Sequence, residues 1–178
     1  MPDSTKLEVG PCNVYLYEGA QDMDLGYMGD ALVVAMSTEA VPLTGAQKGT
    51  VPLDKVVTGG SFRVTVPFKE IKPKNFSRAF PNAVFVGTEG AVERVDFKPR
   101  VGLSLRAQAK KLTLKKIIGG VESTSKSDHI VIPLASAVDA EVSVTFSPTE
   151  QRVINATFEA WPDDATGRWA YMGDELAS

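Results

Sequence analysis

The sequence has few of the residues that most often build metal and redox sites. Its 178 residues include one cysteine, Cys12, and one histidine, His129. A single cysteine excludes a disulfide within the chain, and it fits a reducing cytoplasm or a particle assembled there. A single histidine excludes a metal centre built from several imidazoles. We therefore expect neither a metal nor a cofactor.

Long apolar runs and a strong excess of one charge are also missing. No stretch of ~18 apolar residues is present, so we expect no membrane span and no membrane binding by this chain. Segment 1–10, MPDSTKLEVG, is charged and has no apolar centre, which argues against a secretory signal. The net charge of −3 gives no overall attraction to nucleic acid.

The motifs of common enzymes are absent as well. The sequence has no phosphate-binding loop and no dinucleotide fingerprint. Ser123 and Lys126 have a Ser-x-x-Lys spacing, but they lie in a polar loop without the motifs that accompany a catalytic serine. Cys12 fits a buried, inert thiol and His129 a structural residue. We predict that the protein is not an enzyme and has no catalytic residues.

What the sequence does have is β-type alternation. In the segment 61–67, Phe62, Val64 and Val66 fall on one face of a strand and polar residues on the other. Further strands are predicted at 13–18, 31–37, 83–86, 91–97, 101–107, 111–118, 129–134, 141–147 and 153–161. Segments 111–118 and 129–134 flank a Gly/Ser-rich loop and predict a long hairpin. The fold class is therefore mostly β, an antiparallel sandwich or barrel in one domain covering 1–178.

One short α-helix is expected beside the sheet, at about residues 72–80. Pro73 suits the first helical position, where its missing N–H costs nothing. Ile71 and Phe76 have the spacing of a hydrophobic staple, and Pro81 ends the helix. Phe76 and Phe80 share one face. We predict that Ile71, Phe76 and Phe80 pack this helix against the sheet.

We expect the Gly59-Gly60 pair to break the regular structure. Two stretches before it suggest surfaces rather than core. Strand 31–37 is apolar on both faces, so it is either a covered central strand or part of a subunit interface. Segment 38–58 is predicted to be a long loop, either a docking arm or a disordered surface loop. Segment 1–10 is predicted to be a flexible arm.

The basic residues gather at one place, Lys110, Lys111, Lys115 and Lys116. They could contact phosphates or an acidic partner, or they could simply keep a strand solvated and unpaired at its edge. No aromatic residue is interleaved with them in the sequence, which disfavours single-stranded nucleic acid as a ligand.

Several stretches together resemble the tail tube (major tail) proteins of tailed bacteriophages. The central match is 49–59, GTVPLDKVVTG, followed by 62–67, FRVTVP. Segments 25–33, LGYMGDALV, and 47–54, QKGTVPLD, resemble the family's early strand and the loop after it. Segment 154–163, INATFEAWPD, is similar to the C-terminal strand and turn. These stretches lie before residue 84 and after residue 140, and 84–140 is not part of the match.

The resemblance implies a virion structural protein that is assembled in the bacterial cytoplasm. Its protomers would form hexameric rings stacked into a tube, with genomic DNA and a tape-measure protein in the lumen. Sheath, tail terminator and baseplate proteins would be further partners. We expect the lumen to carry acidic or neutral polar groups, which would let DNA slide. On this basis the predicted subunit-interface residues are Leu32, Val34, Met36, Lys48, Thr50, Leu53, Asp54, Phe62 and Val64.

A second function remains open from the sequence. A small β-sandwich binding or adhesion module, either a carbohydrate-binding domain or a baseplate accessory protein, would have a similar strand pattern. Such a module needs an exposed aromatic platform, for which Trp161 and Trp169 are the candidates.

Overall fold

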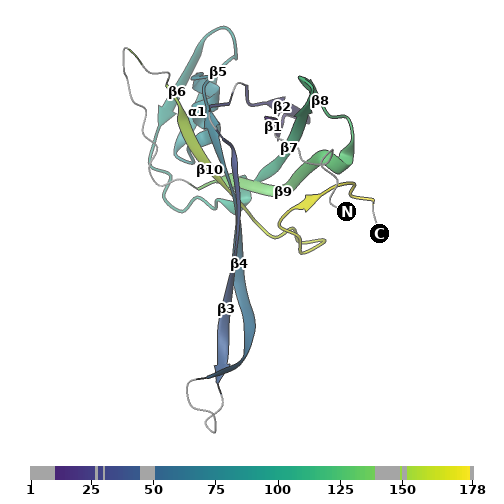
Figure 1. Ribbon diagram of the computed structural model, residues 1–178. Helices are drawn as coiled ribbons and strands as arrows, with labels where there is room; N and C mark the ends of the chain where they lie inside the picture. The colour runs from purple at the N-terminus through teal and green to yellow at the C-terminus, as the bar shows by residue number, and fades with distance from the viewer. Residues whose placement is uncertain are drawn as a thin grey trace.

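The computed structural model describes residues 11–26, 28–29, 31–44, 51–138, 149 and 152–176. The N-terminal segment 1–10, predicted to be flexible, and the predicted strand 141–147 therefore lie outside the described residues. Figure 1 shows a β-rich body from which one long hairpin projects. The elements are, in chain order, β1 (Cys12–Glu18), β2 (Gln21–Asp24), β3 (Val33–Thr44), β4 (Pro52–Phe68), α1 (Pro73–Ala79), β5 (Ala83–Gly87), β6 (Glu93–Phe97), η3 (Arg106–Gln108), β7 (Lys110–Ile118), β8 (Val121–Glu122), η4 (Lys126–Asp128), β9 (His129–Ala137), β10 (Ile154–Ala160) and β11 (Tyr171–Met172).

The main sheet has the strand order β2-β1-β7-β9-β10-β4-β3, and β5 and β6 form a separate pair. The strand pairings of the described residues are all antiparallel. The predicted mostly β, antiparallel fold with one short α-helix is thus confirmed. The predicted hairpin is confirmed as well, because β7 pairs with β9 and short β8 folds back onto β7.

The core lies on one face of this sheet. Alternate residues of the central strands point inward, so that Val64, Val66 and Phe68 of β4 are completely buried. Phe158 of β10 meets Phe68 edge to face, with ring centroids 6.5 Å apart. Other buried side chains come from β1, β7 and β9: Val14, Leu16, Leu112, Leu114 and Ile132.

Helix α1 begins and ends where the sequence predicts. Pro73 occupies the first turn, Lys72 before it has an extended backbone, and the helix ends at Ala79, ahead of Pro81. Ile71, Phe76 and Phe80 pack against the core, as predicted. The rings of Phe76 and Phe80 stack at 5.8 Å, and Phe97 of β6 meets both edge to face. The β5–β6 pair therefore covers the helix.

Three predictions of local structure are wrong. Segment 38–58 is not a loop, because β3 continues to Thr44 and β4 begins at Pro52; residues 45–50 lie outside the described residues. Gly59 and Gly60 do not break the strand, since β4 runs through them. Segment 101–107 is not a strand: Gly102 has φ +82°, Val101 is 99% exposed, and a 3₁₀ turn follows.

Candidate subunit interface

The structure's most distinctive surface is the projecting part of the β3–β4 hairpin. We call residues 33–44 and 51–61 the arm. Every residue of β3 is exposed, and so are residues 52–58 of β4. Figure 1 shows these two strands leaving the body together and extending well beyond it. The C-terminal half of β4 remains in the core, so the arm continues one of the central strands.

The arm exposes large apolar side chains on both of its faces. Val34 and Met36 share the face of Val64 and Phe62, their partners on β4, whereas Val33 lies on the opposite face, across from Thr65. Met36 is 71% exposed and Val57 is 65% exposed. The other exposed large apolar residues of the arm are Val33, Val34, Val41, Leu43, Val51, Leu53 and Val56. Exposed apolar side chains gathered on one projecting element are typical of a contact with another macromolecule.

The arm has an unprotected edge as well as apolar faces. Strand β3 is the last in the order of the main sheet, so its outer backbone groups have no partner strand within the described residues. Natural edge strands are commonly short, charged or covered. β3 has 12 residues, and Glu39 is its one charged residue. Pro42 interrupts the row of donors, which an edge strand tolerates.

The base of the arm is held by close packing around Gly60. A Cβ atom at Gly60 would lie 2.4 Å from the carbonyl oxygen of Ser37 and 3.0 Å from the Trp169 ring, so only glycine fits there. The Ser37 and Ser61 hydroxyls are hydrogen-bonded at 2.8 Å. Beside them the register shifts, because Glu39 faces Gly59 whereas Ala40 faces Val57. This bulge changes which faces the residues farther out occupy.

Comparison with family models and with curated proteins finds no match for this sequence. Within the described residues, no group of three or more His, Cys, Asp and Glu side chains is arranged to hold a metal ion. None of the helices in this part of the chain has the length and apolar character to cross a membrane.

The arm contains many, but not all, of the predicted interface residues. Val34, Met36, Leu53 and Asp54 are exposed on it. Leu32, just before β3, and Phe62, where β4 enters the body, are partly buried against the core. Lys48 and Thr50 lie outside the described residues. Val64 is completely buried, so the prediction that it lies at an interface is wrong: alternation turns it toward the core.

The basic cluster is distributed over both faces of β7 and is largely neutralised. Lys110 pairs with Glu18, Lys111 with Asp22 and Lys115 with Glu122. The ammonium groups of Lys111 and Lys115 also lie over the rings of Tyr17 and Tyr15, at 4.8 and 4.2 Å from the ring centres. No aromatic residue is interleaved with these lysines in the sequence, but the neighbouring strand β1 brings two tyrosines beside them in the fold.

A polar network fixes the β1–β7 face. Burial opposes ionisation of Glu122, but hydrogen bonds from Tyr15, Lys115 and Asn13 outweigh it and lower the pKa of the carboxyl to about 2. The hydrogen bond to Glu122 raises the pKa of Tyr15 to about 12. Each group keeps one protonation state at neutral pH, which suits a structural role better than proton transfer.

The single cysteine and the single histidine occupy ordinary positions. Cys12 is partly buried at the start of β1, and burial raises the pKa of its thiol, so it is a poor nucleophile at neutral pH. The His129 Nε2 atom lies 3.0 Å from the carbonyl oxygen of Ser123, at the end of the β7–β9 hairpin.

The sequence did not predict the close approach of Gly60 to Trp169 or the packing of Phe97 on helix α1. The Gly59-Gly60 pair was a visible signal, but it indicates a bulge and a close approach as well as it indicates a break. Trp169 is more than 100 positions from Gly60, and nothing in the sequence pairs the two.

Proposed function

We propose that this chain is a structural protomer that assembles with copies of itself through the arm, as the tail tube subunit of a bacteriophage virion. The observation that carries the proposal is the arm's combination of exposed apolar faces with an open strand edge. A two-stranded ribbon is marginally stable alone in water, and it gains stability when another chain covers it. The resemblance of 49–67 to tail tube proteins includes the outer half of β4.

Burial of the arm would contribute a large share of the free energy of assembly. Covering one large aliphatic side chain contributes about 1.5–3 kcal/mol. A few residues such as Met36, Val57 and Leu53 would offset much of the about 4–15 kcal/mol of freedom lost on association. Addition of a strand at the β3 edge would supply main-chain hydrogen bonds as well.

The charges of the body are compatible with a conduit for DNA. Tight phosphate binding requires clustered, uncompensated cations. Lys111 and Lys115 of β7 each have a carboxylate partner, Asp22 and Glu122. In the proposed assembly, hexameric rings would stack into the tube, with genomic DNA and the tape-measure protein inside.

The alternative function, a carbohydrate-binding or adhesion module, has less support. Both of its candidate aromatic residues have contacts within the chain. The Trp161 indole donates a hydrogen bond to the Ser136 hydroxyl at 2.8 Å, and Trp169 packs against the core beside Gly60. Both residues are partly buried, so neither is a fully exposed platform.

The test is assembly of matched variants. Val57→Lys places a charge on the arm, and Val101→Lys makes the same change at a 99% exposed turn outside it. Sedimentation velocity and negative-stain electron microscopy of concentrated protein should show rings or tubes for the wild type and for Val101→Lys. Val57→Lys should remain monomeric with an unchanged far-UV CD spectrum. Equal assembly by both variants would refute a role for the arm, and a wild-type monomer at every concentration would refute self-assembly.

A further inference from the structure

A small cavity in the body has a different chemical character from the arm. It has a volume of about 90 Å³ and lies between the end of α1, the segment 100–108 and strands β7, β9 and β10. This is room for several water molecules or one small ion. Its wall combines apolar side chains, Phe80 and Phe158 among them, with three cationic ones: Arg78, Arg100 and Lys110.

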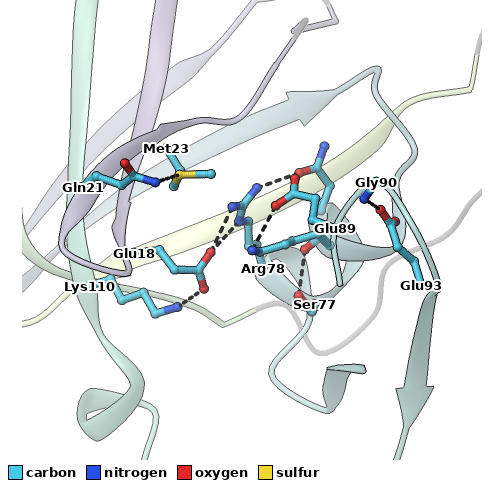
Figure 2. Close-up of polar contacts among 11 residues, drawn as sticks. Glu18, Gln21, Met23, Ser77, Arg78, Glu89, Gly90, Glu93 and Lys110 are labelled. Atoms are coloured by element: carbon cyan, nitrogen blue, oxygen red, sulfur yellow. Dashed lines mark hydrogen bonds and ion pairs between the residues drawn. The ribbon is translucent and has the colours of Figure 1, made fainter. Parts of the chain in front are cut away.

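Two of the three cations share a single carboxylate, that of Glu18. The Arg78 side chain is 4% exposed, and it donates hydrogen bonds from Nε and Nη2 to Glu18 Oε2 at 3.1 and 2.9 Å. Its Nη1 donates to Asn75 Oδ1 at 3.1 Å. Lys110 Nζ contacts the other Glu18 oxygen at 2.6 Å. Figure 2 shows Arg78 and Lys110 approaching Glu18 from two sides.

The third cation has no carboxylate partner within the described residues. Arg100 is partly buried, and its Nη1 donates one long hydrogen bond, 3.3 Å, to the carbonyl oxygen of Pro81. The three cations and the single carboxylate thus leave an excess of positive charge around a partly open cavity. Buried charge is costly unless it is paired, so an anion in this cavity would be stabilised.

Donors for such an anion are available. A guanidinium has five N–H groups, and the hydrogen bonds described above use three of those of Arg78 and one of those of Arg100. Lys110 has donors beyond the one directed at Glu18. A guanidinium group can bind two oxygens of a phosphate-like anion at once, in bidentate geometry. A single neutral water molecule cannot accept hydrogen bonds in this way.

We propose that this cavity is a binding site for a small inorganic oxyanion, with inorganic phosphate as its reference ligand. The oxyanion lies between Arg78, Arg100 and Lys110. The volume of about 90 Å³ fits one tetrahedral ion, whereas the base and sugar of a nucleotide would have to lie outside it. The ion would tie α1 and the segment 100–108 to strand β7. The site lies within one chain and does not depend on the assembly proposal.

The experiment is isothermal titration calorimetry of the full chain, kept monomeric by dilution, with inorganic phosphate at an ionic strength fixed by sodium chloride. We expect saturable binding that sulfate competes away and that adenosine monophosphate does not reproduce. Arg100→Gln should weaken binding by about tenfold or more, because charged hydrogen bonds are lost. The matched control is Arg94→Gln, since Arg94 pairs with Asp96 on β6 and does not line the cavity.

Several outcomes would overturn the proposal. These are the absence of saturable heat with phosphate in the wild type, equal affinity in Arg100→Gln, and equally tight binding of adenosine monophosphate. If Arg100→Gln fails to give the wild-type far-UV CD spectrum, Lys110→Gln replaces it, because the Lys110 side chain is 41% exposed and less needed for folding. Wild-type affinity in that variant would also refute the site.

Discussion

The close packing at Gly60 predicts that alanine at this position destabilises the protein. The neighbouring residue, Gly59, provides a control, because alanine there has room. A Cβ at Gly60 would lie 2.4 Å from a backbone oxygen of Ser37 and 3.0 Å from the Trp169 ring. The backbone oxygen belongs to the paired strand and cannot move without opening the ladder. A Cβ at Gly59 would meet only the Glu39 carboxylate, at 3.4 Å, and that side chain can rotate away.

We therefore expect Gly60→Ala to destabilise the protein by about 1–3 kcal/mol, the cost of overpacking a closely packed site. Gly59→Ala should be neutral, or stabilising by about 0.4–1 kcal/mol, because it restricts the unfolded chain. Each kcal/mol should move the melting temperature by about 2–4 °C in a chain of this size.

Urea denaturation followed by tryptophan fluorescence measures both effects, and an unchanged m-value would show that stability alone has changed. Gly60→Ala should also shift the native emission to the red, because Trp169 is displaced from the base of the arm. Equal midpoints for the two variants would refute the proposed packing of Gly60 against Ser37 and Trp169.

The remaining predictions concern charge and core packing. Glu122→Gln should lower the Tyr15 pKa from about 12 toward its ordinary value of 10.0, seen as earlier tyrosinate absorbance in an alkaline titration. The folded-state pKa of Glu122, about 2, lies below its ordinary value of 4.5. The ionised Glu122 carboxylate therefore contributes its full stabilisation above about pH 4.5 and loses it as the pH falls toward 2. Over that pH range the urea midpoint of Glu122→Gln should fall less than that of the wild type. Arg78→Met should cost about 1.5–3 kcal/mol through lost charged hydrogen bonds, measured by urea denaturation. Phe158→Ala should cost about 3–5 kcal/mol by the same assay.

The core strands could be predicted from the sequence because each has one apolar face. In β4 the alternation of Phe62, Val64 and Val66 is a period-2 signal, and it arises because one side of the strand meets the core. The same reasoning produced a false strand at 101–107. Apolar residues alternate there too, but Gly102 has a positive φ and turns the chain.

The arm and the cavity could not be predicted in the same way. In the arm neither face meets a core, so its residues show no alternation, and Pro42 and Pro52 favoured a loop. The two strands of the arm pair with each other, and the pairing includes a bulge at Thr58, opposite Glu39 and Ala40. The cavity gathers residues 78, 100 and 110 from three different elements, a proximity that only the folded chain creates.

The continuity of β4 has a mechanical consequence. Its outer half lies in the arm, and its inner half pairs with β10 from Arg63, opposite Glu159, to Phe68, opposite Ile154. The hydrogen bonds of this ladder run perpendicular to the strands. A pull on the arm along its axis therefore loads these bonds together in shear, instead of opening them one after another from an end. If protomers are joined through their arms, tension on the assembly is transmitted along β4 to the buried β4–β10 ladder, whose hydrogen bonds resist it together.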